Sequence, residues 1–183
     1  MINLLSMKKI FFIPLILSCS ILILGSGSRP QENVSEVKKE PIARNYNKII
    51  ENITLSTIDN KTFAFKDLKN KIIILNFWAK WNSYCIDSIP KFTQLQNEHT
   101  SKNVQIIGIA MDHSPEDVLN FAKLHNMKYP IIMYNQELKS IFGTINNIPT
   151  TIIIDKSLNI RKKVTGFHSK AFFASEINNT EAK

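Results

Sequence analysis

The chain has 183 residues, of which 44% are hydrophobic, and a formal net charge of +8. This length is enough for one domain of ordinary size plus an export segment. The lysines are scattered, without a basic helix or a recognisable nucleic-acid-binding module, so we do not expect a nucleic-acid partner.

The first 28 residues are organised as an export segment. Lys8 and Lys9 precede an uncharged, apolar run over residues 10–24, and small residues follow. This layout is typical of a secretory signal peptide, here with cleavage after Ser28. Two alternatives stay open: an uncleaved membrane anchor, for which the run is slightly short, and a lipoprotein carrying its lipid on Cys19. Each alternative predicts an exported domain, periplasmic or otherwise extracytoplasmic, and membrane association follows if an anchor or lipid is retained.

Residues 29–48 are polar and indicate a linker, residues 49–179 indicate the folded domain, and residues 180–183 a short tail. A domain of this length buries well over half of the surface of its unfolded chain, so it needs no covalent staples. The chain has two cysteines, Cys19 and Cys85. Because Cys19 lies in the export segment, the domain has a single thiol and forms no internal disulfide.

Runs rich in Ile, Val, Thr and Phe predict the strands of the domain. The predicted strands are residues 53–57, 62–65, 71–78, 104–111, 131–134, 150–155 and 160–165. The first two form a hairpin that precedes the rest, and the last two form a closing hairpin. Residues 71–78 and 104–111 are nearly all apolar, as in central strands that are covered on both faces.

Four helices are expected between and after these strands. They comprise residues 83–100, a helix that starts at Pro115, residues 136–142 and residues 168–179. We expect Pro90 to kink the first helix. Ser114 is expected to cap the second, whose apolar residues from Val118 to Leu124 predict one buried face. Strands and helices in this order predict an α/β fold with a central mixed sheet flanked by helices and an N-terminal hairpin extension.

Several short motifs carry a resemblance to a known family. The strand-end sequence LNFWAKW occupies residues 75–81, Cys85 is followed five residues later by Pro90, and Ile148-Pro149-Thr150 precedes the closing hairpin. Together with the entry segment at residues 60–71, these motifs resemble the thioredoxin fold. More narrowly, residues 52–178 resemble the exported thiol–disulfide oxidoreductases of the TlpA/ResA group, within the AhpC/TSA-redoxin superfamily. The resemblance implies a cis peptide bond before Pro149.

The family resemblance also implies an activity and a set of partners. Proteins of this group exchange thiols and disulfides with envelope proteins, including the cysteines reduced during cytochrome c maturation, and they use no cofactor. The partners that we expect are therefore envelope proteins with cysteine thiols or extended segments. None of the four histidines has metal-ligand spacing to another or to Cys85, so no metal site is expected.

The active-site motif departs from the family pattern W-C-x-x-C-x-x-E-x-P. Asn82 stands where the family has its nucleophilic cysteine, and Ser88 stands where it has an acid–base glutamate. Tyr84 replaces the proline between the two cysteines. Asp87 is adjacent to the lost acid, but neighbouring helical positions are about 100° apart, so Asp87 does not share the face of Cys85.

Dithiol exchange needs one thiol to attack and a second to resolve the mixed disulfide, and the attacking position is the one that Asn82 occupies. We expect Asn82 to act as a helix N-cap that accepts the amide of Tyr84 or Cys85. Cys85 is then the third helical residue, where the helix N-terminus favours a thiolate. Burial has the opposite effect on the thiol, so an inert role and a reactive role for Cys85 both stay open.

Two functions therefore follow from the sequence. In the first, Cys85 acts as a single redox thiol that forms mixed disulfides. In the second, the protein is a redox-inactive binding module whose groove, formed by Trp81, Tyr84, Ile148 and Pro149, accepts an extended polypeptide. A third reading, a thiol peroxidase in which Asn82 mimics a threonine, lacks the arginine that such enzymes place near Pro149.

Overall fold

The structure, a computed structural model, describes residues 46–99 and 103–182. The predicted export segment and most of the predicted linker lie outside these residues. Within the described ranges, no helix combines the length and the apolar character needed to cross a membrane.

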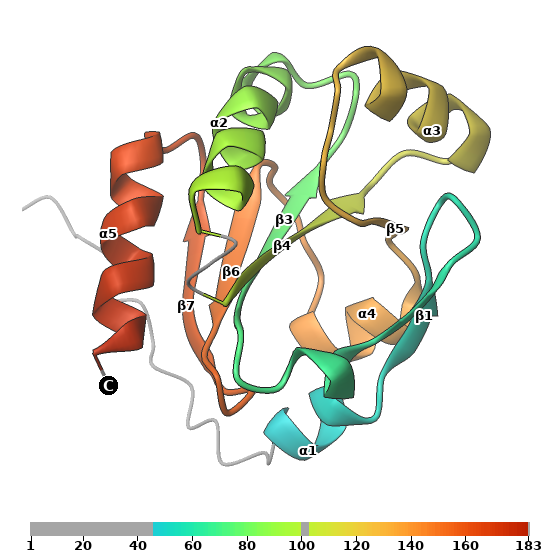
Figure 1. Cartoon of the computed structure of the whole chain (residues 1–183). Helices are drawn as coiled ribbons and strands as arrows, with labels where there is room; N and C mark the ends of the chain where they lie inside the picture. Colours follow the sequence, from blue (N-terminus) through green and yellow to red (C-terminus); the bar gives the residue numbers. More distant parts are fainter. Residues whose placement is uncertain (1–45, 100–102, 183) are drawn as a thin grey trace, which may run out of the picture. The chain divides into compact units, whose positions relative to one another are not determined.

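Five strands form a central mixed sheet in the spatial order β5-β4-β3-β6-β7 (Figure 1). They are β3 (Ile72–Trp78), β4 (Val104–Ala110), β5 (Ile131–Met133), β6 (Thr150–Ile154) and β7 (Ile160–Thr165). β3 lies at the centre, parallel to β4 and antiparallel to β6. Every residue of β3 is buried, which confirms the prediction of a central strand covered on both faces.

Helices cover both faces of the sheet, and the alternation of side chains along β3 separates two cores. The helices are α1 (Tyr46–Glu51), α2 (Ser83–His99), α3 (Pro115–Leu124), α4 (Gln136–Phe142), α5 (Lys170–Glu181) and the short 3₁₀ helix η1 (Phe65–Leu68). Ile72, Ile74 and Trp78 belong to the cluster that α2, α3 and α5 cover. Residues 73, 75 and 77 belong to the other cluster, with α1 and α4.

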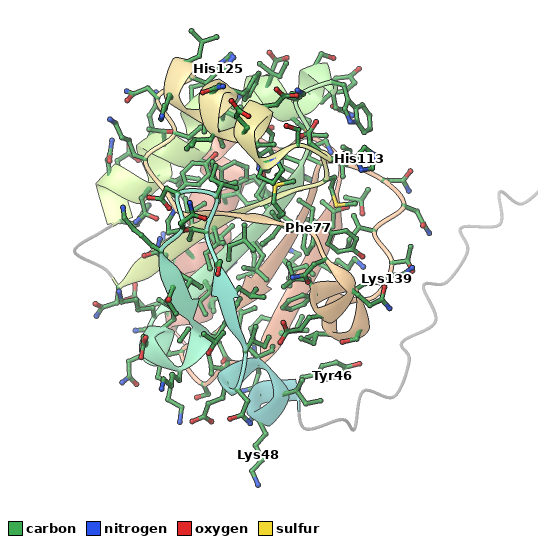
Figure 2. The ribbon with its side chains drawn as sticks, turned by 90° about the vertical axis from the view of Figure 1, so that its right-hand side faces the viewer. Tyr46, Lys48, Phe77, His113, His125 and Lys139 are labelled. Atoms are coloured by element: carbon green, nitrogen blue, oxygen red, sulfur yellow. The ribbon has the colours of Figure 1, made fainter. Side chains whose placement is uncertain are left out.

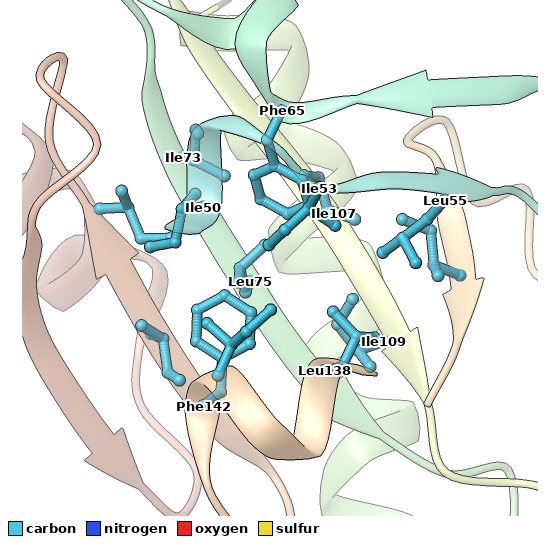
Figure 3. Packing of buried hydrophobic residues seen from close by; sticks show 14 of the residues in the cluster. Ile50, Ile53, Leu55, Phe65, Ile73, Leu75, Ile107, Ile109, Leu138 and Phe142 are labelled. Carbon is cyan, nitrogen blue, oxygen red and sulfur yellow. The ribbon is translucent and has the colours of Figure 1, made fainter. Parts of the chain in front are cut away.

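The N-terminal hairpin covers part of the second core. It consists of β1 (Thr54–Ser56) and β2 (Thr62–Ala64), which pair only with each other as a separate two-stranded sheet. Ile53, Leu55 and Phe65 bring their side chains toward Leu75 and Ile107 of the central sheet (Figure 3). The hairpin is therefore an integral part of the domain and not a detached extension.

A buried glutamine compensates for the shortness of β5. β5 pairs with β4 only from Gly108 to Ala110, so the first part of β4 has no strand on that side. Gln96 of α2 reaches this edge: its Oε1 accepts from the Ile106 amide at 2.7 Å and its Nε2 donates to the Val104 carbonyl at 3.1 Å. The side chain thus satisfies two backbone groups that burial would otherwise leave unpaired.

The α/β class, the central mixed sheet and the N-terminal hairpin are as predicted, and Ser114 caps α3 by accepting the Asp117 amide at 3.2 Å. The predicted apolar face of α3 is wrong at one residue. Leu124 is 81% exposed, because it lies about 200° around the helix from the buried Ala122. Helix α1 begins at Tyr46, before the predicted start of the domain, and α5 ends at Glu181.

Candidate active site at the start of helix α2

Asn82 caps helix α2, as the sequence predicts. Its Oδ1 accepts a hydrogen bond from the Cys85 amide at 3.1 Å, and its carbonyl accepts from the Ile86 amide at 3.1 Å. The side-chain bond satisfies an amide of the first turn that has no i→i−4 partner, and the bond from Ile86 is the first i→i−4 bond of the helix. The helix therefore starts immediately after Asn82 and places Cys85 in its first turn.

The same side chain connects α2 to the loop before β6. Asn82 Nδ2 donates to the main-chain oxygen of Ile148 at 3.2 Å, across 66 positions of sequence. The peptide bond between Ile148 and Pro149 is cis, in agreement with the expectation from the family resemblance. The two sequence motifs that carried the resemblance therefore meet in one site.

The Cys85 side chain is enclosed by the core between α2 and the sheet. It is 1% exposed and belongs to the cluster that includes Trp78 and Ile89, with Ile148 packed against it. Burial raises the pKa of the Cys85 thiol; a hydrogen bond with the Ala79 backbone acts in the opposite direction, and the negative charge of Asp112 raises the pKa further. The thiol is therefore protonated at neutral pH, the form that does not attack a disulfide.

The position predicted for the lost acid carries no titratable group. Ser88 is buried, and its hydroxyl donates to the carbonyl of Tyr84 at 2.8 Å within the same helix. Asp87 is exposed, which confirms that it does not share the face of Cys85. The carboxylate that does influence the sulfur is Asp112, which follows β4 and accepts the Lys80 amide at 3.1 Å.

Large aromatic side chains surround the helix start at the surface. Trp81 is 70% exposed and Tyr84 is 63% exposed, whereas Trp78, three residues before Trp81, is 1% exposed. Phe167 is also exposed, and its ring lies beneath the Lys91 ammonium group at 4.2 Å. Of the predicted groove residues, Trp81 and Tyr84 are thus accessible to a partner, Ile148 is partly buried and Pro149 is buried.

Two of the four histidines, His125 and His168, stack on neighbouring aromatic rings. His125 stacks on Phe121 with ring centroids 4.0 Å apart, and His168 stacks on Phe172 at 4.4 Å. Among the described residues, no group of three His, Cys, Asp or Glu side chains is arranged to hold a metal ion.

The comparisons with known proteins agree with this geometry. The family model described as AhpC/TSA family matches residues 47–163. Over 121 residues the chain is 31% identical to the thiol-disulfide oxidoreductase ResA of Bacillus cereus, covering 65% of this chain and 69% of that protein. It is 24% identical to ResA of Bacillus subtilis over 166 residues, which is 90% of this chain and 87% of that protein.

A solved structure shows the same fold at a similar level of identity. The thiol:disulfide interchange protein of Chlorobium tepidum, a thioredoxin family protein, superposes with a TM-score of 0.67 and 33% sequence identity. The match covers 70% of this chain and 92% of that protein. The residues matched by the family model include both α2 and the loop before β6, and α5 lies beyond them.

Proposed function

We propose that this chain, which belongs to the AhpC/TSA family and within it to the ResA-type thiol–disulfide oxidoreductases with a thioredoxin fold, is an extracytoplasmic binding protein for extended polypeptide segments. In this proposal the protein keeps the partner-binding surface of the fold but does not perform dithiol exchange.

One contrast carries the proposal. Along one stretch of five residues, the sulfur of Cys85 is closed off at 1% exposure, while Trp81 and Tyr84 are 70% and 63% exposed. A protein that works by thiol attack needs the opposite arrangement, because the thiolate must reach a partner's sulfur. Exposed aromatic side chains are the residues that most often contribute binding energy at protein interfaces.

The surface beside these aromatic residues suits an extended chain. The main chain of Ile148 lies next to the start of α2, where it accepts one hydrogen bond from Asn82 Nδ2. A carbonyl oxygen has two lone pairs, so this oxygen retains one acceptor site for an amide of a partner. Pairing of main chains in this way supplies affinity, and contacts with Trp81 and Tyr84 supply specificity.

The N-terminal sequence supports the cellular location in this proposal. Lys8, Lys9 and the apolar run over residues 10–24 have the layout of an export segment,. We propose that export delivers the domain, residues 49–179, to the cell envelope, with residues 29–48 as its linker. The partners are then unfolded or extended segments of envelope proteins, including segments that contain cysteine.

A second candidate function uses Cys85 as a single redox thiol. The hydrogen bond with the Ala79 backbone favours a thiolate, and so does the position of Cys85 in the first turn of α2. The Cys85 thiolate would attack a partner disulfide, form one mixed disulfide and release one partner thiolate; a further partner thiol would resolve it. This route requires the site to open, since the sulfur is 1% exposed.

Binding of an unfolded protein without free thiols separates the two candidates. The probe is fluorescently labelled, carboxymethylated α-lactalbumin, and its anisotropy is followed on titration with the full chain in lipid nanodiscs. We expect saturable binding that is unaffected by dithiothreitol and is weakened about fivefold or more by Trp81→Ala or Tyr84→Ala. Leu124→Ala is the matched control, because Leu124 is a large hydrophobic residue that is 81% exposed elsewhere.

The absence of saturable binding would contradict the binding function, and so would an equal loss in all three variants. Capture of an unmodified, disulfide-containing partner that dithiothreitol fully reverses would instead support the single-thiol function.

A further inference from the structure

A pocket of about 680 Å³ lies between the β1–β2 hairpin and the C-terminal end of α3. Its lining includes the hairpin residues between Thr57 and Phe63 except Asn60, residues of α3 and the segment that leads into β5. In Figure 1 these elements are the teal hairpin and the olive helix α3. None of the lining residues belongs to the site at the start of α2, so the pocket is a separate feature of the domain.

The hairpin wall of the pocket is held in place by hydrogen bonds. The Ile58 amide donates to the Ile131 carbonyl at 2.9 Å, and Thr57 forms an isolated bridge with Ile132. Within the hairpin tip, the Lys61 amide donates to Thr57 Oγ1 at 3.0 Å. The tip is therefore fixed to the edge strand β5, and the pocket is a preformed hollow, as most small-molecule sites are.

The floor of the pocket is apolar and belongs to the core. Ala122, Tyr129 and Ile131 line it, and they are 7%, 6% and 4% exposed. Phe63 and Met127 add apolar side surfaces. In the described part of the chain the Tyr129 hydroxyl, although buried, has no hydrogen-bond partner. A ligand entering this pocket therefore buries an apolar body against side chains that already exclude water.

The rim of the pocket carries an excess of positive charge. Its charged residues are Lys61, Lys123, Lys128 and Asp59. Lys61 and Asp59 pair with each other at 2.8 Å. Among the described residues, neither Lys123 nor Lys128 forms an ion pair, so these two ammonium groups remain available to an anion.

The adjacent helix end does not cancel this charge. The carbonyl groups at the C-terminus of α3 carry partial negative charge. Here the amides of His125, Asn126 and Met127 donate back to the carbonyls of Phe121, Lys123 and Ala122 at 2.9–3.1 Å. These bonds cap the helix and leave the lysine ammonium groups as the dominant charges at the rim.

From this combination we infer that the pocket binds a small amphiphilic anion, with an aromatic or short aliphatic body on the floor and a carboxylate between Lys123 and Lys128. The volume is in the range of about 300–1,000 Å³ that small-molecule sites occupy. The body removes apolar surface from water, and the two lysines recognise the charged head. The inference does not depend on the proposed polypeptide binding, because the two sites share no residue.

The test uses 3-(4-fluorophenyl)propionate as the probe and fluorine NMR of the probe to follow its binding to the full chain in lipid nanodiscs. Empty nanodiscs provide the blank. We expect saturable binding that the double variant Lys123→Glu/Lys128→Glu weakens about fivefold or more, because attraction is replaced by repulsion. The neutral alcohol 3-(4-fluorophenyl)propanol is expected to bind more weakly and to respond little to this variant.

The matched control is Lys139→Glu/Lys163→Glu, which changes the net charge by the same amount at two exposed lysines outside the pocket. Figure 2 shows Lys139 on α4, away from His125 at the end of α3. This variant should leave the affinity for the acid within about twofold of the unmodified protein. The inference is overturned if the acid does not saturate the protein at millimolar concentration, if both double variants weaken it equally, or if acid and alcohol bind alike.

Discussion

Asn82 and Ile148 are joined by a hydrogen bond in which the side-chain amide of Asn82 donates to the main-chain oxygen of Ile148 at 3.2 Å. Oδ1 of the same side chain accepts a hydrogen bond from the backbone amide of Cys85 at 3.1 Å. One neutral side chain thus caps helix α2 and fixes the loop before β6 against it. In the family resemblance this is the position of the attacking cysteine, so the residue that interrupts the redox motif also completes the local structure.

The two bonds of Asn82 can be separated by substitution. Asn82→Ala removes both the cap and the donor, and we expect it to lower the free energy of unfolding by about 1–2 kcal/mol. Asn82→Asp retains the acceptor and adds a favourable negative charge at the helix N-terminus but cannot donate to Ile148. Asn82→Asp should therefore lower the free energy of unfolding by less than Asn82→Ala does. Urea unfolding measures the free energy of unfolding of both variants. Equal losses in the two variants would show that capping by Asn82 does not contribute to stability.

Restoring the second thiol tests whether the site keeps the family geometry. Asn82 Oδ1 lies 3.1 Å from the Cys85 amide, so we expect Asn82→Cys to form a disulfide with Cys85 that dithiothreitol reduces. The variant should also acquire some insulin-reductase activity, which we do not expect of the unmodified protein. Ser83→Cys is the control, because Ser83 is exposed. Two persistent free thiols in oxidised Asn82→Cys, counted by mass spectrometry after alkylation, would contradict the assignment of position 82.

The sequence predicted those parts of the fold that depend on local pattern. The uninterrupted apolar runs identified β3 and β4, and an asparagine before a helix identified the cap of α2. The hydrogen bond from Asn82 to Ile148 joins residues 66 positions apart, and no local pattern contains it. The burial of Cys85 was equally undetermined, because it depends on the assembly of a core cluster that contains Cys85 and Ile89 and against which the distant Ile148 packs.

Two helical features show where local pattern misleads. Residues 46–48 were assigned to the polar linker, yet they form the first half of α1, the helix whose Ile50 is completely buried. Leu124 was assigned to the core of α3 on its apolar character, but it lies on the outer side at the end of the helix. In both cases tertiary packing, rather than intrinsic preference, determined the outcome.

The raised pKa of the Cys85 thiol predicts how stability depends on pH. The folded protein holds its thiol proton to a higher pH than the unfolded chain does, whose thiol pKa is about 8.5. The associated stability is thus complete below that value and is lost as pH rises through the folded pKa. We expect the unmodified protein to lose more stability between neutral and alkaline pH than Cys85→Ala does. Urea unfolding at several pH values measures this dependence. If stability changes with pH in parallel for the unmodified protein and Cys85→Ala, the result would argue against a raised pKa of the Cys85 thiol.

The buried Gln96 pairs with the open edge of β4. Its substitution is therefore expected to lower the free energy of unfolding by more than a typical polar substitution in a helix does. Gln96→Leu removes the partners of the Ile106 amide and the Val104 carbonyl. Leaving buried backbone groups unsatisfied costs about 1–3 kcal/mol each, so we expect a loss of at least about 2 kcal/mol in the free energy of unfolding. Gln94→Leu, at an exposed position of the same helix, should change it by less than about 0.5 kcal/mol. Similar losses in both variants would refute the role given to Gln96.

The central claim is that the Cys85 sulfur is closed while the surrounding surface is accessible. Its most direct test uses the full chain with Cys19→Ser, so that Cys85 is the remaining thiol, and measures the rate at which Cys85 reacts with 5,5′-dithiobis(2-nitrobenzoate) at neutral pH. The account predicts that the folded protein reacts far more slowly than the urea-unfolded chain, at a rate that rises with the population of the unfolded state. A folded protein that reacts as fast as the unfolded chain would contradict it and would establish Cys85 as an accessible redox thiol.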